Sequence, residues 1–560
     1  MTVTPSPGAG TLPSEPVTGP VTGPGPEAED PTAVSGRFLA KATLVTASLS
    51  IAGSVLGLVR DQSLARLFGA GSETDAFLVA WTIPEFAATL LIEDGLAFAL
   101  IPAFSLALAR RAQGVPGDPV RSLVAGTLPR LALGLVAVST LVIGAAPYLA
   151  GALAPGLADP RPATDCMRLT ATCVLSFGLA GYCSAVLRAH RSFLAPAAIY
   201  VIYNAGIITA MFLLGGRLGV RSAAVGVSVG GFLMVAVQLP PLCRQLRQRT
   251  RTPSGGRARA LCDDSVPPER PMDLGLVTTV LLFALCRQSQ VLIERFLAST
   301  LPAGSISHLN YAQKVAQIPM SLSLMLCTVT FPVVARALAE GHVERARGRV
   351  ERDLALTSCL VLSGVSAVIA CAPQIVQLLF QRGAFTAQDT AATAQVLRVY
   401  ALGLLGQTLV GVLIRSYFSA GRANWYPVGA MTVGIVVTSW IGAATVHSFG
   451  VAGIAAANAV GITTTATLLL TGMRRHSMPV RTRRVLAELS RPLRAAVVAT
   501  ACGAFTASVP RSAAAGLALG LLTVTVVFGL LARALGALGV TPVLRSVRTA
   551  TRRHAHGLFR

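Results

Sequence analysis

The sequence predicts an all-α polytopic membrane protein, and three observations lead to that fold class. Of the 560 residues, 53% are hydrophobic and 13% are charged, and the mean hydropathy is +0.64. Soluble domains, by contrast, carry about 25% charged residues. Apolar stretches of roughly 20 residues, the length of a helix that crosses a bilayer core, recur along nearly the whole chain. The short alternating strands of a transmembrane barrel, about ten residues each, are not seen.

The apolar runs, taken against the polar segments between them, predict about fourteen transmembrane helices. Several of these runs contain Gly and Pro, which membrane helices tolerate when neighbouring groups satisfy the freed backbone. In chain order the spans are expected to begin near Phe38, Asp75, Arg130, Met167, Ala195, Ala223, Leu274, Ala316, Leu354, Val396, Tyr426, Ile454, Ala495 and Ala514.

The alternation of apolar and polar segments divides the chain into helical lobes, linkers and tails. Residues 1–37 are rich in Pro, Gly, Thr and acidic residues, which is typical of a disordered cytoplasmic tail and not of a signal peptide. We expect, in order, an N-terminal helical lobe (38–246), a basic cytoplasmic linker (247–272), a C-terminal helical lobe (273–473), a basic cytoplasmic loop (474–494), two additional helices (495–537) and a basic cytoplasmic tail (538–560).

The connections between the spans predict the orientation, because cytoplasmic loops concentrate Lys and Arg. Every second loop is basic, and the alternate loops carry little positive charge. Both termini are therefore expected in the cytoplasm, with an even number of spans in the cytoplasmic (inner) membrane. The net charge of +23 follows from these loops, which we expect to contact anionic membrane lipid and not nucleic acid.

An internal echo indicates that the two lobes are related. The stretch LARLFGAGSETDAFLVAWTIP in the first half is echoed by LASTLPAGSISHLNYAQKVAQIP in the second. Aligning the Ala-Gly-Ser triplets at 70–72 and 303–305 places Asp61 on Glu294, so each lobe has a carboxylate beside an arginine. Transporters built from repeats hold substrate and coupling ions at the interface between the repeats.

Charged side chains in the apolar segments are the candidate substrate-binding residues. Each costs at least about 2.5 to 3.5 kcal/mol near the bilayer centre, so such residues usually face a cavity or one another. Arginine grips phosphate oxygens with a planar fork and lysine acts as a point charge, so a cavity that held four of these cations would suit a diphosphate headgroup. The candidates are Arg60, Asp61, Asp75, Glu93, Arg287, Arg295 and Lys314, and the four cations are Arg60, Arg287, Arg295 and Lys314.

The stretches around these residues resemble the MurJ/MviN family of lipid II flippases, within the MOP transporter superfamily. The resemblance is carried by GLVRDQSLARLFGAGSETDAFLVAWTIP, ERFLASTLPAGSISHLNYAQKVAQIPMSL, FPVVARALAEG and LLFQRGAFTAQDTAATAQVLRVYALGL, and runs from about Phe38 to Leu470. It implies fourteen helices in two pseudo-symmetric lobes plus two C-terminal helices that form a groove for a lipid tail. It also implies export of an undecaprenyl-diphosphate-linked peptidoglycan precursor from the cytoplasmic leaflet.

The resemblance implies roles for individual residues. Arg60 and Asp61 match the family's first-helix motif, and Asp75 and Glu93 match its second-helix aspartate and glutamate. Two more positions differ from the family in residue type. Glu294 stands where the family has an aspartate that resembles a sodium ligand, and Lys314 stands where it has an essential arginine.

Further departures mark this chain as a divergent member. Ser54 and Ala88 replace family arginines in the first and second helices, and Gln313 replaces the aspartate before Lys314. In the eleventh helix, Thr438 and Gly442 stand where polar sodium ligands are expected.

Together these features predict a transporter and not an enzyme: a flippase that moves lipid II across the membrane by alternating access. The sequence has no Walker A, GxSxG, HExxH or zinc-ligand spacing, so we expect no bound cofactor and a coupling ion, sodium or proton, as the source of energy. The alternatives are a related exporter of another lipid-linked glycan or of small solutes, and a non-transporting envelope scaffold. Expected partners are membrane lipid, the lipid-linked diphosphate glycan and proteins of cell-wall synthesis.

Overall fold

The computed structural model describes residues 36–93, 95–113, 118–247, 274–328, 342–418, 423–477 and 480–537. Every regular element in these ranges is helical, which confirms the predicted all-α class. Nearly all of the predicted N-terminal tail, basic linker and C-terminal tail lies outside the described residues.

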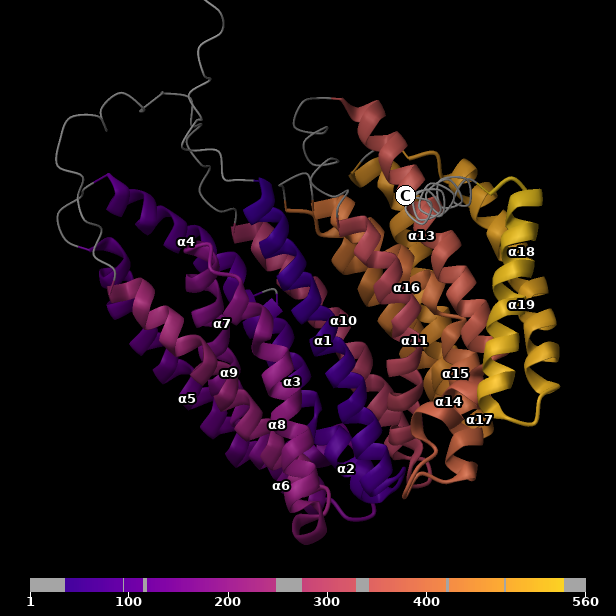
Figure 1. Ribbon diagram of the computed structural model, residues 1–560, viewed down its shortest axis with the longest axis horizontal. Helices are drawn as coiled ribbons and strands as arrows, with labels where there is room; N and C mark the ends of the chain where they lie inside the picture. Colours follow the sequence, from indigo (N-terminus) through magenta and orange to yellow (C-terminus); the bar gives the residue numbers. More distant parts are fainter. Residues whose placement is uncertain are drawn as a thin grey trace, which may run out of the picture.

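The first lobe, which we call the N-lobe, contains nine α-helices and one short π-helix within the described part of the chain (Figure 1). In order they are α1 (Gly36–Phe68), α2 (Ser72–Ala80), α3 (Thr82–Ala87), the π-helix η1 (Ala88–Glu93), α4 (Gly95–Ala112), α5 (Pro119–Leu153), α6 (Arg161–Ala171), α7 (Cys173–Ala189), α8 (Leu194–Leu218) and α9 (Arg221–Arg247).

The second lobe, the C-lobe, begins with α10, and two further helices pack on its outer edge (Figure 1). α18 and α19 pack on each other, and α18 also packs along α13, as expected for the two additional helices. The elements are α10 (Leu274–Ser299), α11 (Ser305–Thr328), α13 (Val343–Ala370), α14 (Ala372–Phe380), α15 (Ala387–Ala401), α16 (Leu404–Phe418), α17 (Tyr426–His476), α18 (Thr482–Ser508) and α19 (Ala513–Ala534).

Nine helical segments of the described chain are long and apolar enough to cross a membrane, or ten if the bent pair α15 and α16 is one span. The predicted number of fourteen is therefore not confirmed by this measure. One reason is that α11, which contains Lys314 and several Gln and Ser residues, is not among the nine. Another is that α17 counts once although Gly450, with φ +57°, breaks it into two helices.

Several helices begin earlier in the chain than the apolar runs predicted. α5 begins at Pro119 and not near Arg130, because Asp118 caps its first turn by accepting from the backbone N–H groups of Val120 (3.2 Å) and Arg121 (3.3 Å). α11 and α13 likewise begin about three turns before the predicted positions, at Ser305 and not near Ala316, and at Val343 and not near Leu354. Hydropathy identifies only the part of a helix that suits lipid, so it does not detect the polar first turns of these helices.

Candidate functional site

The two lobes meet where the echoed turns of the repeat face each other. Asp75, in the first turns of α2, accepts hydrogen bonds from the Gly304 N–H (2.7 Å), the Ser307 N–H (2.8 Å) and the Ser307 hydroxyl (2.6 Å). These are unpaired donors at the N-terminus of α11, where the helix dipole also favours a carboxylate. Asp75, expected in the substrate site, thus caps a helix of the opposite lobe.

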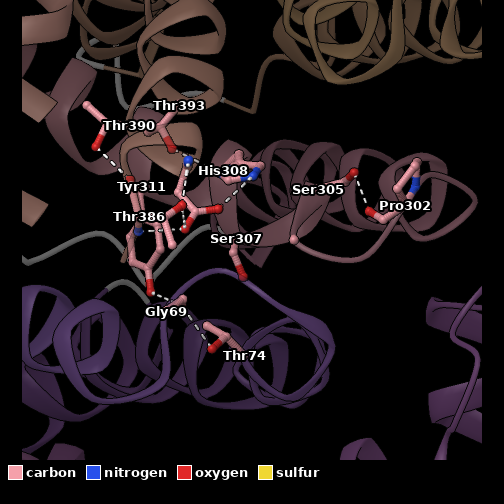
Figure 2. Close-up of polar contacts among 12 residues, drawn as sticks. Gly69, Thr74, Pro302, Ser305, Ser307, His308, Tyr311, Thr386, Thr390 and Thr393 are labelled. Carbon is pink, nitrogen blue, oxygen red and sulfur yellow. Dashed lines mark hydrogen bonds and ion pairs between the residues drawn. The ribbon is translucent and has the colours of Figure 1, made fainter. Parts of the chain in front are cut away.

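Backbone groups of loops from both lobes complete this interlobe junction. The Ala384 N–H donates to the Arg66 carbonyl at 2.9 Å. Figure 2 shows the second contact, in which the Tyr311 hydroxyl donates to the Gly69 carbonyl at 3.5 Å. A Cβ on Gly383 would lie 2.3 Å from the Arg66 oxygen, so glycine allows this close approach. The junction therefore depends on backbone fit as well as on the Asp75 carboxylate.

His308, one residue beyond Ser307, joins α11 to α15 inside the C-lobe. Its Nδ1 lies 3.0 Å from the Thr393 hydroxyl, and its Nε2 lies 3.7 Å from the Asp389 carboxylate (Figure 2). Asp389 also forms the capping box of α15 with Thr386. The first turn of α11 is thus held by Asp75 from one lobe and by α15 from its own.

A second interlobe contact consists of Thr82, Glu85, Arg295 and Lys314, which we call the Glu85 cluster. Arg295 on α10 donates to Glu85 Oε2 on α3 at 2.7 Å and also to the Thr82 hydroxyl. Lys314 Nζ on α11 lies 3.5 Å from Glu85 Oε1. One N-lobe carboxylate therefore binds two C-lobe cations, and the two predicted residues Arg295 and Lys314 are brought together.

Glu85 was not among the predicted site residues. The sequence did contain a signal, because Glu85 is an acidic residue inside the apolar second segment, where a charge usually has a partner. Its partners lie more than 200 residues away along the chain, so only the tertiary structure identifies them.

Arg60 and Asp61 form a separate polar site inside the N-lobe. The Arg60 guanidinium donates to Asp61 Oδ1 at 2.7 and 3.0 Å and to Asn204 Oδ1 on α8 at 3.1 Å. It also lies 4.3 Å from the centre of the Trp81 ring, within range of a cation–π interaction. These contacts of Arg60 are all made within its own lobe, whereas Lys314 contacts Glu85 between the lobes.

Glu93 is the last residue of η1, and its side chain is exposed. It accepts a hydrogen bond from the Tyr200 hydroxyl of α8 at 3.1 Å. π-helical turns are rare and occur often at functional sites, which makes this segment notable, but its contacts lie apart from the Glu85 cluster.

Arg287 lies on the wall of a cavity inside the C-lobe. The cavity has a volume of about 130 Å³ and is lined by side chains of α10, α11, α15, α16 and α17, among them Arg287, Glu294 and Tyr400. Gln290 also lines it, and the Gln290 Nε2 is buried without a hydrogen-bond partner among the described residues. The expected cavity position of Arg287 is thus observed, but within one lobe.

Glu294 is buried at this cavity between two side-chain amides. Gln313 donates to Glu294 Oε2, and Asn458 of α17 donates to Glu294 Oε1. Thr438, expected near this carboxylate, instead donates to the Gly434 carbonyl of its own helix at 3.0 Å. Asn458 is therefore the α17 residue that contacts Glu294, and the sequence analysis missed it.

The donors around Glu294 do not fit a sodium site in this conformation. A hard cation requires several oxygen ligands, whereas both carboxylate oxygens here accept from amide N–H groups. Within the described ranges, no group of three or more His, Cys, Asp and Glu side chains could hold a metal ion.

Comparison with known proteins agrees with this architecture. The family model described as lipid II flippase MurJ matches residues 64–528, which span most of both lobes and the added helices. The chain belongs to the lipid II flippase MurJ family. The resemblance noted in the sequence is thereby confirmed.

Individual relatives of the MurJ family show the extent of the similarity. The chain is 28% identical over 449 residues to the lipid II flippase MurJ of Burkholderia cenocepacia, covering 79% of this chain and 84% of that protein. It is 26% identical over 489 residues to a probable lipid II flippase MurJ of Vibrio cholerae, covering 83% and 89%.

Solved structures show the same fold. A lipid II flippase MurJ in an inward closed conformation matches with a TM-score of 0.68 at 18% identity, covering 88% of this chain and 99% of that one. An inward-facing multidrug resistance MATE transporter of the MOP superfamily matches with a TM-score of 0.58 at 15% identity, covering 79% and 98%. The fold is thus shared with a transporter of the MATE family.

In this member of the MurJ family, the four predicted cations lie in three separate places. Arg295 and Lys314 share Glu85 between the lobes, Arg60 lies in the N-lobe site, and Arg287 lines the C-lobe cavity. Ser54, which the resemblance aligns with a family arginine, is exposed and donates to the Ser50 carbonyl of its own helix at 3.1 Å.

Proposed function

We propose that this protein is a flippase that moves lipid II, a polyprenyl-diphosphate-linked peptidoglycan precursor, across the cytoplasmic membrane by alternating access. The observation that carries the proposal is the family match over residues 64–528, which includes both lobes and the two added helices. The two relatives described above are named a lipid II flippase and a probable lipid II flippase.

The contacts between the lobes support the alternating-access part of the proposal. Alternating access requires two bundles that separate at one end of the membrane while joined at the other. The junction around Asp75 lies at the end of the molecule that holds α2 and α6, and the lobes diverge toward the opposite end (Figure 1). The hydrogen bonds of this junction can be exchanged for hydrogen bonds to water when the lobes separate.

The charges between the lobes support a diphosphate substrate. Arg295 and Lys314 lie together at the interface, where a carrier with two repeats binds its substrate. We assign substrate binding to Arg295 and Lys314 first, with Arg60, Asp61, Asp75, Glu93 and Arg287 as residues that contact the substrate or set the lobe positions.

For the coupling ion we propose a proton and not sodium. A buried carboxylate held by two amide donors beside a polar cavity can gain or lose a proton without further ligands, whereas sodium would require the amides to turn their oxygens inward. The Gln290 amide adds a free polar group to the same cavity.

We also propose the orientation that the basic loops predict, with both termini in the cytoplasm. The junction around Asp75 would then lie at the outer face of the cytoplasmic membrane, and the lobes would diverge toward the inner face. Proteins of cell-wall synthesis are the proposed partners at this membrane.

Complementation tests the proposed function. A bacterium depleted of its own lipid II flippase should grow when it expresses this chain and should fail with Lys314→Ala, whereas Asp165→Asn, which alters an exposed ion pair with Arg221, should grow. Immunoblots of membranes establish equal expression. No growth with the wild-type chain at full expression, together with proton-driven efflux of small cations from vesicles, would instead support the solute-exporter alternative.

The coupling proposal has its own test in vesicles that contain the purified protein. Replacing Glu294 with Gln should abolish the dependence of lipid II translocation on a pH gradient, because the amide cannot release a proton in this range. A translocation rate that follows a sodium gradient and ignores the pH gradient would refute the proton assignment.

A further inference from the structure

The Glu85 cluster has more positive than negative charge. It contains one carboxylate and two cations, and the carboxylate of the adjacent Glu294 is bound by the Gln313 and Asn458 amides, so Arg295 and Lys314 share Glu85 as their ion-pair partner. Arg295 is directed at Glu85 by a second hydrogen bond to Thr82, which holds the guanidinium in place. A site of this kind already binds one anion, Glu85, and attracts another.

The chemistry of Glu85 resembles that of a phosphate group. A carboxylate presents two oxygens to Arg295 and Lys314, and a phosphate presents oxygens that the same donors bind in the same way. A diphosphate carries more negative charge than one carboxylate, and it can therefore compete for both cations at once.

The exposed fractions of the side chains in the Glu85 cluster indicate which cation an incoming anion would contact first. The Lys314 side chain is 28% exposed, Glu85 20% and Arg295 6%. The Lys314 contact with Glu85 is also the longer one, 3.5 Å against 2.7 Å for Arg295. An anion can therefore reach Lys314 first, while Arg295 stays bound to Glu85.

We propose that Glu85 is an internal anion that occupies the substrate cations Arg295 and Lys314 while the lobes are joined, and that the diphosphate of the substrate displaces it. This inference rests on the proposed function and adds a residue that determines specificity and links binding to lobe separation. Because Glu85 belongs to the N-lobe and both cations to the C-lobe, its displacement removes an interlobe ion pair. The substrate then favours the separated state, since a ligand shifts an equilibrium only by its differential affinity for the two states.

Binding of farnesyl diphosphate, a soluble prenyl diphosphate, to the purified full-length protein in detergent tests this proposal. Glu85→Gln removes the competing charge and should bind the probe about 5- to 10-fold more tightly than the wild type, the lower end of the range for coupling between two sites. Arg295→Gln and Lys314→Gln should bind it more weakly. Glu344→Gln is the matched control, because the exposed Glu344 side chain pairs with Arg347 within the first turns of α13, and its replacement should leave the affinity unchanged.

Equal or weaker binding by Glu85→Gln, with a wild-type melting temperature, would overturn the inference and leave Glu85 as a static ion-pair partner. Should Glu85→Gln not fold, Glu85→Asp replaces it: the shorter carboxylate should raise the affinity by about two- to fivefold, and no rise would again overturn the proposal. Complementation by the wild-type chain decides the proposed function independently. Growth of the complemented strain without tighter binding by Glu85→Gln would therefore refute only the role of Glu85.

Discussion

The two lobes place an arginine beside a carboxylate at corresponding positions of their first helices, but they use the pair differently. In the N-lobe, Arg60 binds its neighbour Asp61 and the Asn204 side chain. In the C-lobe, Glu294 binds amides inside its own lobe, whereas Arg295 reaches across to the N-lobe. The N-lobe pair thus binds only within its lobe, whereas the C-lobe pair contributes Arg295 to the contact between the lobes.

The order of the two residues explains this difference. When Asp61 is aligned with Glu294, the arginine comes one residue before the carboxylate in α1 and one residue after it in α10. Each residue advances a helix by about 100°, so the two arginines leave equivalent helices in directions about 200° apart. A repeat can therefore keep its fold and still place a cation on a different face.

The aligned residues Asp75 and His308 differ in the same way, because Asp75 binds the opposite lobe and His308 binds Thr393 of its own lobe. Replacement of Asp75 should have the largest effect. Asp75→Ala would leave the buried N–H groups of Gly304 and Ser307 unpaired, which should destabilise the joined lobes by about 2 to 5 kcal/mol. Growth in the complementation strain should be lost, and thermal unfolding in detergent should occur at lower temperature. Asp165→Ala is the control, and wild-type growth with Asp75→Ala would show that the junction is not needed.

The two echoed glycines, Gly71 and Gly304, should differ in their tolerance of alanine. Gly304 has φ +94°, and a Cβ there would lie 2.9 Å from the Ala70 carbonyl, whereas Gly71 has extended backbone and open space around it. Gly304→Ala should therefore cost about 1 to 3 kcal/mol. Gly71→Ala should stay within about 0.5 kcal/mol. Thermal unfolding of both variants measures this, and equal melting temperatures would contradict the asymmetry.

The N-lobe site should require arginine and not only positive charge. Arg60→Lys keeps the charge but loses the fork that reaches Asp61 and Asn204 and the stacking on Trp81, at a cost of about 1 to 2 kcal/mol. The exposed Arg221→Lys is the matched control. If thermal unfolding of the two variants agrees, the planar geometry of Arg60 contributes nothing measurable.

The smallest effect on stability is expected at Arg287, whose side chain is exposed at the C-lobe cavity. Arg287→Gln should change the free energy of unfolding by no more than about 0.5 kcal/mol, as for other exposed positions. Titration with farnesyl diphosphate should nevertheless show weaker binding if the cavity wall attracts the substrate. Unchanged binding would remove Arg287 from the proposed substrate residues.

The sequence was sufficient for the features that depend on local physical chemistry. Hydropathy predicted the all-α membrane class, and the echo of the Ala-Gly-Ser turns predicted two related lobes. It also predicted that Asp75, Arg295 and Lys314 face a cavity or one another, because charges in apolar segments need partners. Their burial or pairing in the structure agrees with that argument.

The partners of those charges depended on the tertiary structure alone. Nothing in the chain near Arg295 specifies Glu85, and nothing near Glu294 specifies Asn458, because each contact joins helices that are far apart in sequence. Hydropathy and helix period report which residues must be buried and on which helix they lie. The packing of the lobes determines which of these buried groups face one another. For this reason only the tertiary structure shows that Arg295 and Lys314 share Glu85, a carboxylate that was not among the predicted site residues.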